Sequence, residues 1–257
     1  WNNVYGMRPS HGLVPGDAAG EMVLHPLSTD GPMARCPRDM AALLETLAGA
    51  DPYHPLGAGF VAGDVSGTLK GKRIGWLGDW GGAYAMEPGL LDLAADALAR
   101  MEDLGAVVEP VTPPFPAAAI WDSWTVLRAF AVAGRRGALY ADPAKRARLK
   151  PELIWEIEKG RALSGQEVLA ASAARSDWYR RAAVMFETHD ALVLPSAQVW
   201  PFPADRDWPK MIAGRRMDCY HRWMEVVCPV SLLGLPAVNL PAGFGENGLP
   251  GGVQLFG

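Results

Sequence analysis

Residues 73–77, RIGWL, and residues 88–111, PGLLDLAADALARMEDLGAVVEPV, decide the fold class of this chain. The first stretch is short and apolar, as a buried strand is. The second begins with apolar residues at the spacing of one helix face and then reaches Gly105 and a second apolar run. A strand, a helix, a glycine stop and a strand form a βαβ unit, in which the strands pair in parallel through a right-handed crossover. The pattern predicts an α/β fold.

The helices predicted in the first two thirds of the chain are consistent with an α/β fold. An apolar stripe over residues 37–48 predicts a helix with four inward side chains, Met40, Leu43, Leu44 and Leu47. Residues 117–187 have a mainly helical pattern with breaks at Pro143 and Pro151. Within them, Ser164 and Glu167 form a capping box, which predicts a long helix starting near Gln166.

The last third of the chain alternates between strands and one further helix. Residues 190–195 read as a buried strand that ends in the loop 196–203, and residues 213–226 as a helix. Residues 234–244 and 248–257 then form two strands joined by a hairpin. Because no repeat, low-complexity segment or linker interrupts the pattern, residues 1–257 are predicted to form a single domain.

Composition narrows the class of protein. With 49% hydrophobic and 20% charged residues, the 257-residue chain is an ordinary globular protein. A net charge of −4 without a basic stripe argues against nucleic-acid binding, and no apolar run is long enough to span a membrane. Its three cysteines lack CxxC spacing, which argues against a disulfide framework or a zinc site. We therefore predict a cytoplasmic protein without a metal or another cofactor.

The loop after the strand at 190–195 is the best local candidate for a binding site. Ligands of open α/β sheets bind beyond the carboxyl ends of the strands. Ser196 and Gln198 offer hydrogen bonds there, and Trp200 offers an apolar wall. Trp124 is a further candidate for the wall of a pocket. The alternative reading, a proline-stiffened surface loop and a core tryptophan, stays open.

Other reactive residue types are predicted to be structural. The chain has no GxSxG, Walker or HExxH motif. His11 and His25 lie in loops, and Cys219 and Cys228 read as core thiols. Two pairs of carboxylates, Asp17 with Glu21 and Asp205 with Asp207, read as solvated loop residues rather than as a hydrolytic pair.

Several segments, taken in order, resemble the amidase signature family of amide hydrolases. Residues 6–15, GMRPSHGLVP, resemble the family's GLKPTxGRVP segment, with Arg8 in place of the usual lysine. Residues 190–196, DALVLPS, resemble its DxLLxPT element. Residues 234–244, GLPAVNLPAGF, and 248–255, GLPGGVQL, resemble its GLPAxSVPxGF…GLPxGxQL ending. The resemblance covers the whole chain and implies a mixed central sheet covered by helices on both faces.

The resemblance also implies a mechanism. The family cleaves amides with a Ser–cis-Ser–Lys triad, in which the lysine is the general base and the cis-peptide serine relays the proton. The second serine attacks the carbonyl carbon to give an acyl-enzyme. Aligned on Gly6, that nucleophile falls about seven residues before Trp1. The triad is therefore expected upstream of this chain, the family's last helix is expected after Gly257, and these 257 residues alone are expected to be inactive.

Three interpretations remain open. The stand-alone bacterial amidase type is favoured, with a small-molecule amide as its substrate. This type is compatible with a homodimer. The glutaminase subunit of a tRNA-dependent amidotransferase is the first alternative, although it usually carries a DSTS-like stretch where this chain has residues 51–56, DPYHPL. A non-catalytic binding module that reuses the fold is the second.

Overall fold

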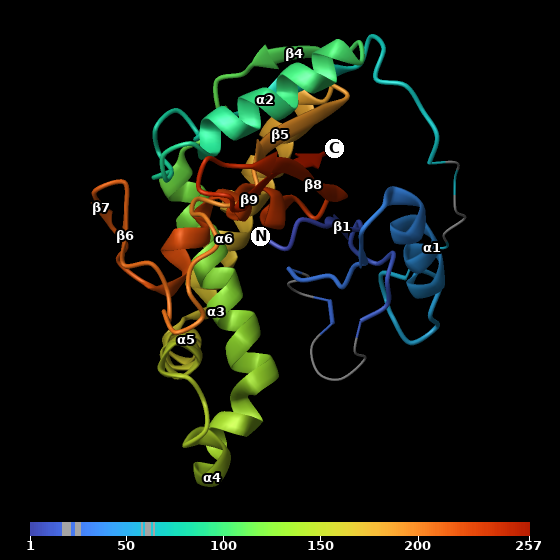
Figure 1. The fold of residues 1–257 in the computed structure, drawn as a ribbon. Coiled ribbons are helices and arrows are strands. Elements are labelled where there is room, and N and C mark those ends of the chain that lie inside the picture. The colour runs from blue at the N-terminus through green and yellow to red at the C-terminus, as the bar shows by residue number, and fades with distance from the viewer. Residues whose placement is uncertain (17–21, 24–26, 58, 60–62, 64) are drawn as a thin grey trace.

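The computed structural model describes residues 1–16, 22–23, 27–57, 59, 63 and 65–257. In this part of the chain a seven-stranded mixed sheet has the order β2-β1-β8-β9-β5-β3-β4 (Figure 1). Its strands are β1 (Tyr5–Arg8), β2 (Met33–Ala34), β3 (Arg73–Trp76), β4 (Val107–Pro110), β5 (Ala191–Pro195), β8 (Ala237–Phe244) and β9 (Pro250–Phe256). Strand β3 pairs in parallel with β4 and β5, and the remaining pairs are antiparallel.

The predicted βαβ unit is confirmed. Helix α2 (Leu90–Asp103) connects β3 to β4, and Arg73 lies opposite Val107 in the parallel register. The helix starts two residues later than Pro88 because Gly89, its N-cap residue, has a φ of 85°. That left-handed conformation favours glycine and ends the preceding loop.

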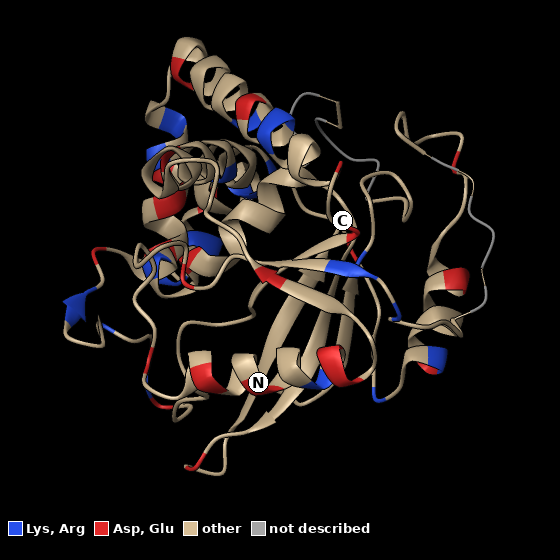
Figure 2. Ribbon diagram, turned by 90° about the horizontal axis from the view of Figure 1, so that it is seen from above, with Lys and Arg blue, Asp and Glu red and all other residues tan. Residues whose placement is uncertain are grey.

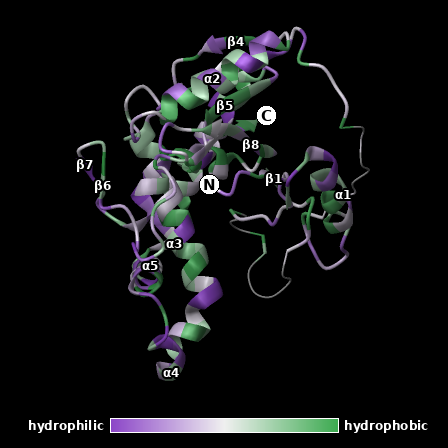
Figure 3. Ribbon diagram, viewed as in Figure 1, coloured by the Kyte–Doolittle hydropathy of each residue, from purple (hydrophilic) through white to green (hydrophobic). Residues whose placement is uncertain are grey.

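Two apolar layers lie on opposite faces of the sheet (Figures 1 and 3). Leu192 and Leu194 of β5 face a core shared with α3 (Ala117–Ala141), α6 (Gly165–Met185) and α7 (Cys228–Leu233), whereas Val193 faces α2. Alternating side chains of one strand thus bury in different cores, as expected for a sheet covered on both faces. Trp178 of α6 is fully buried and donates its indole N–H to the Pro229 carbonyl at 2.9 Å, which joins α6 to α7.

The helical region projects from the sheet as an arm. It consists of α3 with α4 (Pro143–Arg146) and α5 (Pro151–Ala162), and α4 lies at its far end (Figure 1). Both predicted breaks are confirmed, because Pro143 and Pro151 each begin a new helix. The capping box is confirmed as well, since Ser164 and Glu167 bond each other's backbone N–H groups at the start of α6. Figure 2 shows that acidic and basic residues both occur on the helices.

The helix predicted for residues 213–226 is wrong. Strands β6 (Met211–Ile212) and β7 (Arg215–Arg216) form a small hairpin there, because Ala213 and Gly214 turn the chain with φ values of 45° and 79°. A 3₁₀ helix, η1 (Tyr220–Val227), follows. It is broken at Met224, where φ is −117° and ψ is 21°. Helix α7 then begins with Pro229 in its first turn.

The inward stripe predicted for α1 (Pro37–Leu47) is partly wrong. Met40 and Leu44 are buried, but Leu43 and Leu47 are 41% and 39% exposed. The helix packs on β1 and β2 at the edge of the sheet, so only a narrow side of it is covered. The predictions for Asp17, Glu21 and His25 lie outside the described residues.

No helix in the described residues combines the length and the apolar character needed to cross a bilayer.

Candidate functional site at the carboxyl edge of the parallel strands

Two loops meet where the parallel strands β3 and β5 end. Residues 77–89 follow β3 and residues 196–203 follow β5. The Glu87 N–H donates to the Gln198 carbonyl at 2.9 Å, and the Trp200 N–H donates to Glu87 Oε2 at 2.7 Å. This edge is where ligands of α/β sheets bind. We call these two loops together with η1 the carboxyl-edge site.

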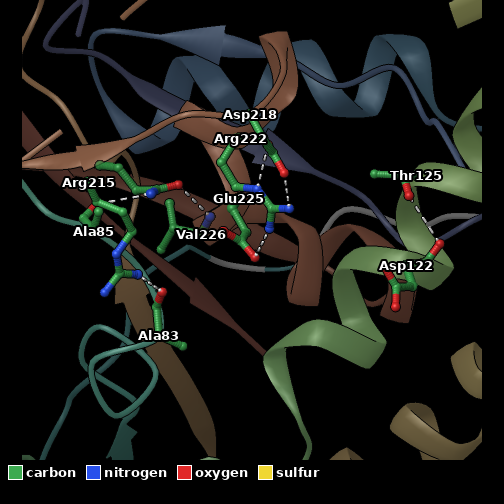
Figure 4. Close-up of polar contacts among 10 residues, drawn as sticks. Ala83, Ala85, Asp122, Thr125, Arg215, Asp218, Arg222, Glu225 and Val226 are labelled. Atoms are coloured by element: carbon green, nitrogen blue, oxygen red, sulfur yellow. Dashed lines mark hydrogen bonds and ion pairs between the residues drawn. The ribbon is translucent and has the colours of Figure 1, made fainter. Parts of the chain in front are cut away.

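Gln198 connects the three parts of this site. Its side chain is 1% exposed, its Nε2 donates to the Ala85 carbonyl at 2.9 Å, and its Oε1 accepts the Val226 N–H at 3.1 Å. Figure 4 shows Ala85 on the loop and Val226 on η1. The amide predicted to face a ligand is thus bonded to backbone groups of two other segments.

A second buried glutamine, which the sequence analysis missed, bonds the same residue of η1. Gln254 of β9 donates its Nε2 hydrogens to the carbonyls of Pro195 and Val226 at 2.9 and 3.1 Å. Both backbone polar groups of Val226 are therefore bonded to glutamine side chains. The signals in the sequence are a glutamine inside an apolar strand and its place in the GLPGGVQL segment.

Ionic contacts fix the outer side of the site (Figure 4). Arg222 makes a two-pronged contact with Asp218, at 2.9 and 2.8 Å, and donates to Glu225 Oε1 at 2.9 Å. Burial raises the pKa of the Glu225 carboxyl, and hydrogen bonding from Arg222 lowers the pKa of Asp218. Arg215 of β7 donates to the carbonyls of Gly82 and Ala83. The β6–β7 hairpin is therefore hydrogen-bonded to the loop after β3.

Two further predicted residues belong to the same loop as Gln198. Trp200 donates its indole N–H to the Pro88 carbonyl at 3.0 Å, and a Cβ at Gly245 would lie 2.5 Å from its ring. The glycine thus leaves room for the indole to pack on the β8–β9 hairpin. Ser196 is half-buried, and its backbone N–H donates to the Gly252 carbonyl at 3.0 Å.

Trp124 lies elsewhere, in the helical layer. It is buried, and its ring contacts His221 edge-on with the centroids 5.4 Å apart. With Trp155 and Glu156 it lines a cavity of about 10 Å³, which is too small for an organic substrate. The structure therefore groups Ser196, Gln198 and Trp200 in one loop and leaves Trp124 apart from them.

An aromatic cluster covers the carboxyl-edge site next to the first residue of the chain. Trp1 stacks on Trp223 with centroids 5.4 Å apart and meets Phe202 edge-on at 4.9 Å. The Trp1 indole N–H also donates to the Val199 carbonyl at 3.1 Å. Segment 1–4 therefore lies against both the loop after β5 and η1.

Two histidines lie in cationic surroundings. Burial, together with the nearby Arg128, lowers the pKa of His221 to about 4; the ring accepts from Arg128 Nε at 3.2 Å. Burial, together with Arg8 and Arg175, likewise lowers the pKa of His11 to about 4. Both imidazoles are therefore neutral near pH 7. Although His221 Nε2 also lies 3.5 Å from a Glu156 oxygen, a neutral ring forms no ion pair.

The remaining candidates are structural. Burial raises the pKa of the Cys228 thiol well above its usual value, as expected for a core thiol. Asp205 and Asp207 are exposed, as predicted for solvated loop residues. Within the described ranges, no group of three or more His, Cys, Asp or Glu side chains could hold a metal ion.

Comparisons with known proteins agree with this architecture. The family model described as Amidase matches residues 1–257. An acylamidase of Rhodococcus erythropolis is 28% identical over 98% of this chain and 53% of its own length. A glutamyl-tRNA(Gln) amidotransferase subunit of Symbiobacterium thermophilum is 31% identical over 100% of this chain and 56% of its own length.

A solved structure is similar over the same span. The crystal structure of a bacterial aryl acylamidase of the amidase signature family superposes with a TM-score of 0.88 at 26% identity, and the match covers 100% of this chain and 55% of that one. The chain thus spans about half the length of the relatives it matches.

Proposed function

Because the chain belongs to the amidase signature family, we propose that it is part of an amide hydrolase that works through a Ser–cis-Ser–Lys triad lying upstream of Trp1. The family match over residues 1–257 is the observation that carries this proposal. In the reaction, the lysine accepts a proton from the bridging serine, which accepts one from the nucleophilic serine. The nucleophile's oxygen bonds to the carbonyl carbon, the C–N bond breaks, and the amine leaves with the relayed proton. Water then hydrolyses the acyl-enzyme.

In this proposal the described residues supply part of the substrate-binding wall. A nucleophile about seven residues upstream of Trp1 lies within about 25 Å of it along even a fully extended chain. Since Trp1 is bonded to Val199 and stacked on Trp223, that reach supports the carboxyl-edge site as the nearest wall. Of the residues predicted to bind substrate, Ser196 and Trp200 of its loop stay our candidates for contact. Gln198, also predicted, supports that loop from within, and Trp124, predicted likewise, lies apart in the helical layer.

The substrate we propose is a small-molecule amide, and the likeness to two acylamidases supports a stand-alone enzyme. A cytoplasmic location is part of the proposal, and three cysteines without a disulfide support it. The glutaminase subunit of an amidotransferase is the alternative, supported by the relative of that name.

The test uses the protein encoded by the complete reading frame around these residues. We expect it to hydrolyse members of a panel of aliphatic and aryl amides, and a serine-directed reagent to abolish turnover by labelling a peptide upstream of Trp1. Replacing that serine with alanine should lower kcat at least about 10³-fold. The 257-residue chain alone should show no turnover.

Three results would contradict the proposal or redirect it. Turnover by the 257-residue chain that serine reagents leave unchanged would refute the upstream triad. An upstream sequence without a serine in a GGS-type element would favour the binding module. Glutaminase activity that requires partner subunits would favour the amidotransferase.

A further inference from the structure

We propose that Gln198 and Gln254 are positioning residues for the carboxyl-edge site: together they hold η1 at Val226 and thereby set the place of the aromatic residues that η1 carries. This inference rests on the proposed function for its kinetic consequence. Its structural part, that two amide side chains hold η1, can be tested without any activity.

The backbone of η1 is irregular next to Val226 and leaves the Val226 carbonyl without a regular 3₁₀ partner. Met224 leaves the helical conformation two residues before Val226. A regular 3₁₀ helix would bond the Val226 carbonyl to the N–H of residue 229, but Pro229 has none. Gln198 instead accepts the Val226 N–H at 3.1 Å, and Gln254 donates to the Val226 carbonyl at 3.1 Å.

Both glutamines are themselves fixed. They are 1% and 7% exposed, and each bonds a further backbone carbonyl at 2.9 Å: Ala85 for Gln198 and Pro195 for Gln254. The side chains therefore join η1 to the loop after β3 and to the last residue of β5. If either amide is lost, a buried backbone group of Val226 loses its glutamine partner, so η1 is expected to shift.

The face that η1 presents is aromatic. Trp223, three residues before Val226, stacks on Trp1 and meets Phe202 edge-on with centroids 5.5 Å apart. Tyr220 meets Trp223 edge-on at 6.3 Å. A displaced η1 moves these rings, and the two glutamines act on it through backbone groups of Val226. The expected consequence is therefore on substrate binding rather than on the chemical step.

The kinetic test uses the full-length enzyme and replaces each glutamine by a side chain of similar size. Gln198→Met and Gln254→Met should each raise KM about tenfold and change kcat less than about threefold. Gln166→Met, on the exposed first turn of α6, is the matched control and should leave both constants unchanged.

Glutamate variants test which hydrogen bonds of each glutamine side chain are needed. Gln198→Glu keeps an oxygen for the Val226 N–H and loses the donor to Ala85, so KM should stay within about threefold of the parent value. Gln254 uses its NH₂ group for both bonds, so Gln254→Glu should behave like Gln254→Met. The two glutamate variants are thus expected to differ although the chemical change is the same.

A spectroscopic measurement on the full-length protein tests the structural part, and it needs no activity. The stacked Trp1–Trp223 pair should contribute to the near-ultraviolet circular dichroism. The methionine variants should lose at least half of the contribution that a Trp223→Phe variant removes. If a methionine variant does not fold, the leucine variant of the same residue, which likewise lacks both amide groups, takes its place.

The outcomes are distinguishable. Unchanged KM and unchanged circular dichroism in folded Gln198→Met and Gln254→Met would overturn the inference. Lower thermal stability without a change in KM or in the tryptophan signal would also overturn it, because it would leave only a structural role. A parent enzyme without amidase activity would refute the proposed function alone, and the tryptophan signal would still decide whether the glutamines hold η1.

Discussion

Gly160 is the residue at which two helices of the arm approach most closely. A Cβ there would lie 2.0 Å from the Ala129 carbonyl oxygen of α3, a distance that no side chain tolerates. Gly134 of α3 has no atom within 4 Å of the same point and is exposed. A side chain is thus excluded at Gly160 and accommodated at Gly134.

Gly160→Ala should lower the free energy of unfolding by about 2–3 kcal/mol, because α5 must move away from α3. Gly134→Ala is the matched control and should raise it by about 0.5–1 kcal/mol through helix propensity. Urea denaturation of both variants measures the difference. Equal effects of the two substitutions would contradict the close packing of α3 and α5 at Gly160.

Gln198 shows how far a single residue of the site could be predicted. The sequence correctly indicated a polar side chain among apolar neighbours at the end of a strand. Its two partners, however, are backbone groups 113 and 28 residues away, and no local pattern reports them. Trp1 was missed for the same reason, because its partner carbonyl lies 198 residues away.

At the scale of the element, the sequence correctly predicted those helix starts that depend on neighbouring residues. The start of α6 and the starts of α4 and α5 follow from a capping box and from prolines, all within a few residues of the helix end. The helix predicted for residues 213–226 failed because tertiary contacts decide that segment: a left-handed turn at Gly214, a side chain of the loop after β5 and a side chain of β9 override its periodicity. Its spacing of apolar residues alone favoured a helix.

Ser164→Ala should cost about 1 kcal/mol of stability, since it removes the acceptor for the Glu167 N–H at the start of α6. Ser176→Ala, on an exposed turn of the same helix, should stay within about 0.5 kcal/mol of the parent chain. Thermal unfolding followed by circular dichroism measures both. A larger loss for Ser176→Ala would show that the box does not hold the first turn.

At the scale of the whole molecule, buried histidines make stability depend on pH. His11 and His221 have a folded pKa of about 4, below the ordinary value of about 6.5. Between these values the unfolded chain binds protons that the folded chain does not. The contribution of the two histidines to the free energy of unfolding is therefore fully present above about pH 6.5. It is lost as the pH falls toward 4. Burial raises the pKa of Glu156 and Glu225, so these two carboxyls favour the folded state more as the pH falls.

The melting temperature should fall steadily from pH 7 to pH 5, and His221→Gln should make this fall less steep. Glutamine keeps an acceptor for Arg128 and takes up no proton on unfolding. Differential scanning calorimetry at constant ionic strength measures both chains. The same slope for the variant and the parent would contradict a neutral, buried His221.

The pairing of β1 with β8 has a consequence for synthesis on the ribosome. Arg8, at the end of β1, donates to the Ser231 carbonyl, a partner 223 residues later in the chain. At about 5–20 residues per second, roughly 10–45 s separate the appearance of these two groups. During that time β1 has β2 on one side but lacks β8 on the other, and Arg8 lacks the Ser231 carbonyl. Nascent β1 is therefore open to chaperone binding until the β8–β9 hairpin emerges.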